Sequence, residues 1–306
     1  MSATEELGEV PALTGGHRAG DAPLKGVLLV VLAVFLFACM DVTTKYLSQS
    51  YAVPTIMAIR YFGNLILLVA LLAPKHGMGL VRTQRTGLVV LRGLCLVAGS
   101  LGAGLALQRM PVPETMSIVF LAPVAVVFVA RPILGERIGL VGWLAALAGF
   151  AGVLLIARPG SGLDALGVAL ALGCAAVTVV FYILTRLLSA TETTNAMLFH
   201  ATLAGAVAFG LMLPWSWGGP EPSALDVALL VAMGAVGGLG HFCFAAAFRY
   251  ARASLLAPVN YLQIVWGAIL AALVFGHVPD GVTVIGMAII AAAGVAVGLR
   301  AHFGRR

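Results

Sequence analysis

The chain has 306 residues, of which 61% are hydrophobic and only 10% charged, and its formal net charge is +6. A soluble domain carries about 25% charged residues, and a globule of this length cannot hide so much apolar surface from water. These proportions exclude a water-soluble fold and favour helices that face lipid. The 37 glycines agree with this, because small residues let membrane helices approach closely.

The chain begins with a polar segment. Residues 1–24 carry Glu5, Glu6, Glu9 and Asp21, and they lack the basic start and short apolar core of a signal peptide. We expect residues 1–24 to form a disordered cytoplasmic tail before an uncleaved first helix. Residues 301–306 are expected to form a second cytoplasmic tail.

Apolar runs of about 20 residues, the length that spans a bilayer, fill the rest of the chain. Ten such runs are separated by polar loops, at residues 26–45, 54–72, 88–107, 114–130, 139–157, 165–185, 194–214, 225–247, 253–275 and 282–299. The predicted fold class is an all-α integral membrane protein with ten transmembrane helices. The four cysteines lie inside these runs without CxxC spacing, so we expect no disulfide framework, no metal site and no cofactor.

The basic residues set the orientation, because cytoplasmic loops carry an excess of Lys and Arg. With both termini in the cytoplasm, thirteen of the 18 basic residues face the cytoplasm and three (Lys45, Arg109 and Arg158) face the other side. We therefore predict a multi-pass protein of a bacterial inner membrane with both termini cytoplasmic. Arg92 lies about one turn into the third helix and is expected to contact a lipid phosphate.

The two halves of the chain resemble each other. Gly276 follows Gly135 at the same interval at which Arg186 in TRLLS follows Lys45 in TKYLS. We predict one repeat at residues 25–158 and a second at 164–300. Five helices in each half make the repeats face opposite ways, a common plan for secondary transporters with a binding site near the midplane. Part of the similarity arises from composition alone, since Gly, Ala and Leu dominate both halves.

Ionisable side chains inside a bilayer are costly, so they indicate a cavity or a partner. Asp41 and Lys45 are four residues apart on one face of the first helix, and Arg60 lies at a similar depth in the second. Asp41 is expected to neutralise Lys45 or Arg60, either in a substrate or proton site or as a structural ion pair. Lys45 is also long enough to reach the interface. Glu114 begins the fourth helix and is expected to stabilise the helix dipole.

Polar residues also lie deep in the second half. His200 and His241 are either packing residues or proton carriers, since histidine titrates near neutrality. The ninth helix, APVNYLQIVWG from Ala257, has amides among aromatic side chains, which is typical of a small-molecule pocket, although polar residues also bond helices to each other. The predicted substrate contacts are Arg60, Asn260, Tyr261, Gln263 and Trp266, and the predicted carriers of charge or protons are Asp41, Lys45, His200 and His241.

The chain contains no GxSxG, HExxH, Walker or GxGxxG motif. We therefore predict no enzyme and no catalytic residue. A membrane sensor or another non-transport role is the alternative of a different class, but the loops are too short to hold a signalling domain.

A set of motifs resembles the EamA branch of the drug/metabolite transporter superfamily. They are DVTTKYLS from Asp41, RYFGN from Arg60, VLRGLCLVAGSL from Val90, MPVPETMSIVFLAPV from Met110, ILGERIGLVGWLAALAGFAGVLL from Ile133 and RYARASLLAPVNYLQIVWGAILAALVFGHVPD from Arg249. The resemblance implies ten helices in two inverted repeats around a central cavity. The second repeat often carries Gly-Glu where this chain has Gly276-His277, so a symmetric role for Glu136 lacks its second acid.

The motifs look closest to a subgroup of carriers with diverse substrates. That subgroup includes uptake carriers for S-adenosylmethionine and riboflavin and exporters of opine metallophores. The function predicted is export of a small zwitterionic or anionic metabolite derived from amino acids, by alternating access. Uptake of S-adenosylmethionine or riboflavin is the alternative. The expected partners are the small-molecule substrate, membrane lipid and a coupling proton or ion, and no nucleic acid.

Overall fold

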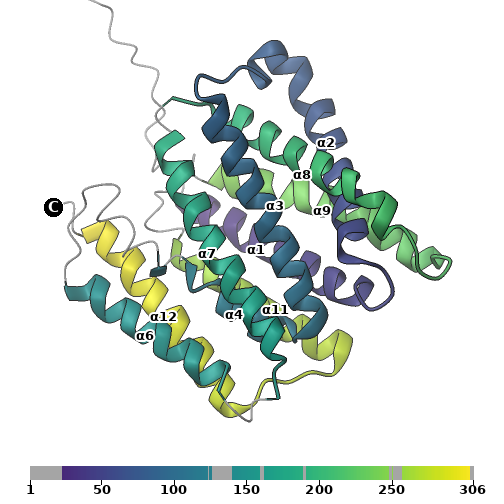
Figure 1. The fold of residues 1–306 in the computed structure, drawn as a ribbon. Coiled ribbons are helices and arrows are strands. Elements are labelled where there is room, and N and C mark those ends of the chain that lie inside the picture. The colour runs from purple at the N-terminus through teal and green to yellow at the C-terminus, as the bar shows by residue number, and fades with distance from the viewer. Residues whose placement is uncertain are drawn as a thin grey trace, which may run out of the picture.

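The computed structural model describes residues 23–122, 124–125, 140–158, 162–188, 191–247, 250 and 257–303. Within these ranges the secondary structure is helical (Figure 1). The elements are α1 (Pro23–Leu47), α2 (Val53–His76), η1 (Gly77–Leu80), α3 (Thr86–Arg109), α4 (Val112–Val119), α6 (Leu140–Ile156), α7 (Ala165–Leu188), α8 (Thr194–Ser216), α9 (Ala224–Ala247), η2 (Ala257–Tyr261), α11 (Leu262–Phe275) and α12 (Gly281–Phe303). The predicted N-terminal tail up to residue 22, Glu136 and residues 304–306 lie outside the described residues.

Each of the ten predicted apolar segments overlaps one of these helices. Six helices in the described part are long and apolar enough to cross a membrane, and three shorter apolar segments accompany them. Large apolar side chains stand on the outside of the bundle, among them Leu273 (77% exposed) and Val231 (69% exposed). Such surface is stable against lipid and unfavourable in water. The structure is therefore of a multi-pass membrane type, and the count of ten crossings stays a prediction.

Two of the predicted segments are not continuous α-helices in the structure. The segment predicted at 253–275 has a 3-10 turn up to Tyr261 and becomes α-helical only from Leu262. The segment predicted from 114 to 130 contains α4, which ends at Val119 in a turn. Each break lies close to a proline of the sequence, Pro258 or Pro123, and proline lacks the amide that an α-helix needs in its interior.

The larger contacts between helices are preserved when the two halves are exchanged. Exchange pairs α1 with α7, α2 with α8, α3 with α9, α4 with α11 and α6 with α12. The contacts α1–α9, α2–α9 and α1–α11 then become α7–α3, α8–α3 and α7–α4, and all six are present. The remaining major contacts, α2–α8, α4–α11 and α6–α12, map onto themselves. This is the pattern of two equivalent halves related by a pseudo-two-fold axis.

Contacts between individual residues are related by the same exchange. A residue of the first half is paired with the residue that follows it at the sequence interval between Lys45 and Arg186. The backbones of α2 and α9 meet at Gly63 and Gly234, where an added Cβ on Gly234 would lie 2.9 Å from the Cα of Gly63. The equivalent positions are Ala204 and Gly93, and a Cβ on Gly93 would lie 2.9 Å from the Cβ of Ala204.

Phe120 and Tyr261 are equivalent to each other by the same interval. Their rings pack against one another with centroids 5.5 Å apart. Because the exchange carries each of these residues onto the other, their contact lies at the pseudo-two-fold axis. The axis therefore passes between α4 and the end of η2.

Hydrogen bonds at the ends of the bundle, here called ties, are also related by the exchange of the two halves. Tyr51 Oη donates to Asp226 Oδ2 at 3.1 Å, and it joins the loop after α1 to the start of α9. The equivalent tie is formed by Glu192, whose Oε1 accepts from the amide of Arg85 at 2.7 Å. Each tie therefore joins a loop of one half to a helix start of the other.

Two ion pairs lie in loops at the end of the bundle where α3 and α6 finish. Arg158 Nη2 is 2.6 Å from Asp280 Oδ2, and Arg109 Nη1 is 3.6 Å from Asp164 Oδ1. The amide of Thr283 and the guanidinium of Arg158 lower the pKa of Asp280 to about 2, so this carboxylate stays charged at any physiological pH. Both pairs are largely exposed and contribute little to stability.

The glycine crossing gives a test of the fold. Gly234→Val should lower the melting temperature of the purified protein in detergent, because the added side chain meets the backbone of Gly63 and overpacking costs about 1–3 kcal/mol. Gly93→Val should have a similar effect at the equivalent crossing. Gly173→Val on α7 is the control, since no described atom lies within 4 Å of its Cβ position. Equal melting temperatures for Gly234→Val and Gly173→Val would contradict this packing.

Candidate functional site

Asp41 and Gln263 form a hydrogen bond between the two halves. The amide Nε2 of Gln263, on α11, donates to Oδ2 of Asp41, on α1, at 2.7 Å. Asp41 was expected to neutralise Lys45 or Arg60, but neither cation lies within the 4.0 Å of an ion pair with it among the described residues. Lys45 Nζ instead donates to the carbonyl of Gln108 at 3.3 Å. A carboxylate inside the bundle is thus held by a neutral amide.

Arg60 lies next to this pair, and no described carboxylate forms an ion pair with it. Its Nη2 donates to Ser100 Oγ at 3.2 Å, and its Nη1 lies 3.6 Å from the sulfur of Met40, the residue before Asp41. The guanidinium also lies over the ring of Tyr61, 4.8 Å from its centroid. Serine, methionine and an aromatic face position the cation but do not neutralise it, so Arg60 is available to an anionic group.

Three other predicted contacts carry buried polar atoms that find no partner among the described residues. These atoms are Oδ1 of Asn260, Oη of Tyr261 and Nε1 of Trp266. A buried donor or acceptor that makes no hydrogen bond costs about 1–3 kcal/mol, and lipid offers no substitute. All three flank Gln263 in η2 and α11. A polar ligand or water that bonded to these atoms would remove the cost, so they are candidates for ligand contact.

Aromatic rings form the walls around these polar atoms. Trp266 packs edge-on against Phe35 of α1 with centroids 5.2 Å apart. Tyr261 packs against Phe120 at the axis between the halves. Neither phenylalanine was among the predicted site residues, because a phenylalanine in an apolar helix carries no sequence signal of its own.

The two histidines separate from each other in the fold. His241 packs on Phe37, one turn from Asp41, with ring centroids 4.9 Å apart. The Nδ1 of His200 bonds to the carbonyl of Ala196 in its own helix at 2.9 Å, and α8 packs on α2 and α3. The structure thus packs the exposed side chain of His241 on Phe37 of α1, and it leaves His200 against other helices.

Arg92 does not face lipid, contrary to expectation. The residue is only 6% exposed, and its Nε donates to Thr185 Oγ1 at 2.7 Å. Its Nη1 donates to the carbonyl of Met197 at 3.2 Å, and its guanidinium stacks on Phe181 at 4.3 Å. Arg92 therefore joins α3 to α7 and α8. Its position one turn inside the helix did not reveal which face of α3 is buried.

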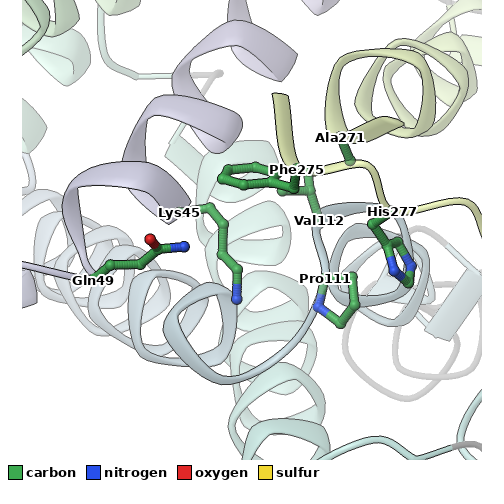
Figure 2. A pocket seen from close by; sticks show the side chains of 7 residues that line it. All are labelled: Lys45, Gln49, Pro111, Val112, Ala271, Phe275 and His277. Atoms are coloured by element: carbon green, nitrogen blue, oxygen red, sulfur yellow. The ribbon is translucent and has the colours of Figure 1, made fainter. Parts of the chain in front are cut away.

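A second polar group lies at the neighbouring ends of α1, α4 and α11. Glu114, in the first turn of α4, is buried, and its Oε1 lies 2.8 Å from Nε2 of His277. Its Oε2 has no partner in the described part of the chain. Beside this pair is a pocket of about 250 Å³ lined by Lys45, Gln49, Pro111, Val112, Ala271, Phe275 and His277 (Figure 2). The sequence showed that His277 stands where the second repeat of the family often has Glu, but it did not show the contact of His277 with Glu114.

The bond between Gln263 and Asp41 can be tested by stability. Gln263→Leu should lower the melting temperature in detergent, because leaving a part-buried carboxylate without its donor costs about 1–3 kcal/mol. Gln49→Leu, which changes an exposed glutamine, is the control. Adding Asp41→Leu to Gln263→Leu should recover part of the loss, and a double variant no more stable than Gln263→Leu alone would count against the bond.

Comparison with known proteins gives a consistent picture. The profile of the EamA-like transporter family matches residues 24–158 and again residues 165–299. The chain is 28% identical to an S-adenosylmethionine uptake transporter of Rickettsia prowazekii (87% of this chain, 90% of that one) and 25% identical to a riboflavin transporter of Vibrio cholerae (88% and 91%). It is 29% identical to the pseudopaline exporter CntI of Pseudomonas aeruginosa (89% and 95%).

The fold is also shared with a solved structure. A crystal structure with 20% sequence identity superposes with a TM-score of 0.65, over 92% of this chain and 99% of the other. The identity is low enough that this likeness concerns the fold alone. The two profile matches together cover most of the sequence, one in each half. The chain is a member of the EamA-like transporter family, and it is a transporter rather than an enzyme.

Proposed function

We propose that this protein is a secondary transporter that exports a small zwitterionic or anionic metabolite derived from an amino acid, across a bacterial inner membrane. The observation that carries the proposal is the polar group on α1, η2 and α11. Asp41 and Gln263 bond to each other there, next to unpartnered atoms of Asn260, Tyr261 and Trp266 in the described structure.

The charges of the site fit a ligand with both signs. Asp41 offers an anionic oxygen to an ammonium group, and its hydrogen-bonding partner is a neutral amide that an ammonium can replace. Arg60 offers a guanidinium that no described carboxylate neutralises. Arginine binds carboxylates in a bidentate geometry. An amino acid derivative presents the complementary pair, and the rings of Trp266 and Tyr261 suit an apolar portion.

The position of the site suits alternating access. Asp41 belongs to the first half of the chain and Gln263 to the second, and Tyr261 contacts Phe120 at the axis between them. A ligand held at this boundary is released on either side when one half rocks against the other. In this proposal Asp41 with Lys45, or His200 and His241, carry charge compensation or a proton. Both termini are placed in the cytoplasm.

Uptake is the second candidate function. The relatives include transporters named for S-adenosylmethionine uptake, at 28% identity, and for riboflavin, at 25%, while the exporter CntI is at 29%. These values are too close to choose a direction. S-adenosylmethionine is itself zwitterionic at its amino acid end, so uptake of it would use the same charged pair.

Metabolite profiles of cells and medium, with and without the gene, test cargo and direction together. Export predicts a compound that accumulates inside the deletion strain and is depleted from its medium. Uptake predicts a compound that stays in the medium of that strain. Identical profiles, with the intact protein shown to be produced, would contradict transport of a metabolite under the growth conditions used.

Variants of the site connect that cargo to these residues. Asp41→Asn and Asn260→Ala should each reduce transport of the identified compound at least tenfold, because each removes a group that we propose to contact it or to balance its charge. Val231→Ala, a change on the exposed surface of α9, is the control for expression and insertion. Full transport by Asp41→Asn and Asn260→Ala at equal protein levels would remove the support for this site.

A further inference from the structure

We propose that the pocket between the ends of α1, α4 and α11 is a separate binding subsite for a carboxylate, with Lys45 as its cation. The proposal rests on the proposed function in one respect, namely that the ligand on its way through is anionic or zwitterionic. The pocket has a volume of about 250 Å³, enough for a small organic acid or for the acidic end of a larger ligand.

Lys45 supplies the charge. Its ammonium has three donors, and the single hydrogen bond that it makes in the described part of the protein is the 3.3 Å contact with the carbonyl of Gln108. No described carboxylate lies within 4.0 Å of Nζ. Figure 2 shows the Lys45 side chain extended between Gln49 on one side and Pro111 on the other. An ammonium that lines a pocket without a counterion attracts an anion.

His277 adds a second polar side chain on the opposite wall. Its Nε2 is occupied by Glu114 Oε1 at 2.8 Å, which fixes the ring and leaves Nδ1 available to a ligand. Glu114 is itself only 4% exposed, and its Oε2 has no partner among the described residues. Glu114 does not line the pocket, so the charged side chain that faces it is Lys45.

The walls favour an organic acid over a bare inorganic ion. Phe275, Val112 and Ala271 give the pocket an apolar side, and Gln49 adds an amide at its rim. Val112 and Ala271 also belong to a buried apolar cluster with Val42, the residue after Asp41. This cluster separates the pocket from the Asp41–Gln263 bond. A carboxylate held at Lys45 is therefore one apolar layer away from the central site.

The charge preference can be measured without knowing the transported compound. A thiol is introduced by Gln49→Cys in the purified full-length protein, and its reaction with an anionic methanethiosulfonate (the sulfonatoethyl reagent) is compared with that of a cationic one (the trimethylammonioethyl reagent). Labelling is read at that position by peptide mass spectrometry, so the four native cysteines can stay. Gly218→Cys, in an exposed loop with no described atom within 4 Å of its Cβ, calibrates the two reagents.

At each position, the labelling rate with the anionic reagent is divided by the labelling rate with the cationic reagent. With Lys45 present, this ratio should be about fivefold or more higher at position 49 than at position 218, as expected for a local positive potential. Lys45→Met should make the two ratios nearly equal, and Lys45→Arg should preserve the difference. Nearly equal ratios with Lys45 in place would overturn the proposal, and this comparison does not depend on how any Lys45 variant folds.

Competition identifies the class of ligand. Benzoate should slow labelling at position 49 at least threefold in the millimolar range, and benzamide, its neutral analogue, should not. Protection by inorganic phosphate but not by benzoate would overturn the carboxylate assignment and indicate a phosphate site, such as one for a lipid headgroup. If this subsite is found while the metabolite profiles show no cargo, only the transport proposal fails. If transport is found and the charge preference is absent, only the subsite fails.

Discussion

The requirement that polar groups be satisfied inside an apolar bundle governs the centre of this protein. Asp41 is a carboxylate among helices whose other side chains are largely hydrocarbon, and the amide of Gln263 from the other half is its hydrogen-bonding partner. Next to it, Asn260, Tyr261 and Trp266 keep polar atoms that no described protein group satisfies. A purely structural core would replace such atoms with apolar ones at no loss of packing. These unsatisfied atoms are the reason why we propose this boundary between the halves as the binding site.

The backbone fold has pseudo-two-fold symmetry, but the polar side chains of the proposed site do not share that symmetry. Glycine crossings, aromatic contacts and loop ties recur at one constant interval in the sequence, because both halves use the same backbone geometry. The same interval takes Asp41 to Tyr182 and Gln263 to Ala122. The bond between Asp41 and Gln263 therefore has no counterpart on the other side of the axis. In the proposed function, this asymmetry would give a ligand with a carboxylate and an ammonium a single orientation.

Two polar groups lie along α1 and α11, and an apolar cluster separates them. The inner one contains Asp41 and Gln263, and the outer one contains Lys45, His277 and Glu114. Val42, Val112 and Ala271 lie in the layer between them. In the proposed transport cycle, a ligand that visits both groups exchanges one set of charges for the other. The arrangement links the geometry of the pocket to the proposed alternating access.

The sequence by itself determined the class of the fold, and it singled out several residues of the proposed central site. Runs of apolar residues must become helices in lipid, since only helices satisfy their own backbone there, and Asn260, Gln263 and Trp266 stood out because polar residues are rare in such runs. Pro123 and Pro258 are visible in the sequence, and the α-helical structure is interrupted near each of them. Partners were decided only by the tertiary structure. Asp41 bonds to Gln263 rather than to Lys45 or Arg60, Arg92 faces inward, and Glu114 contacts His277. Helix rotation and packing set which side chains face each other, and the spacing of residues along one helix does not determine this.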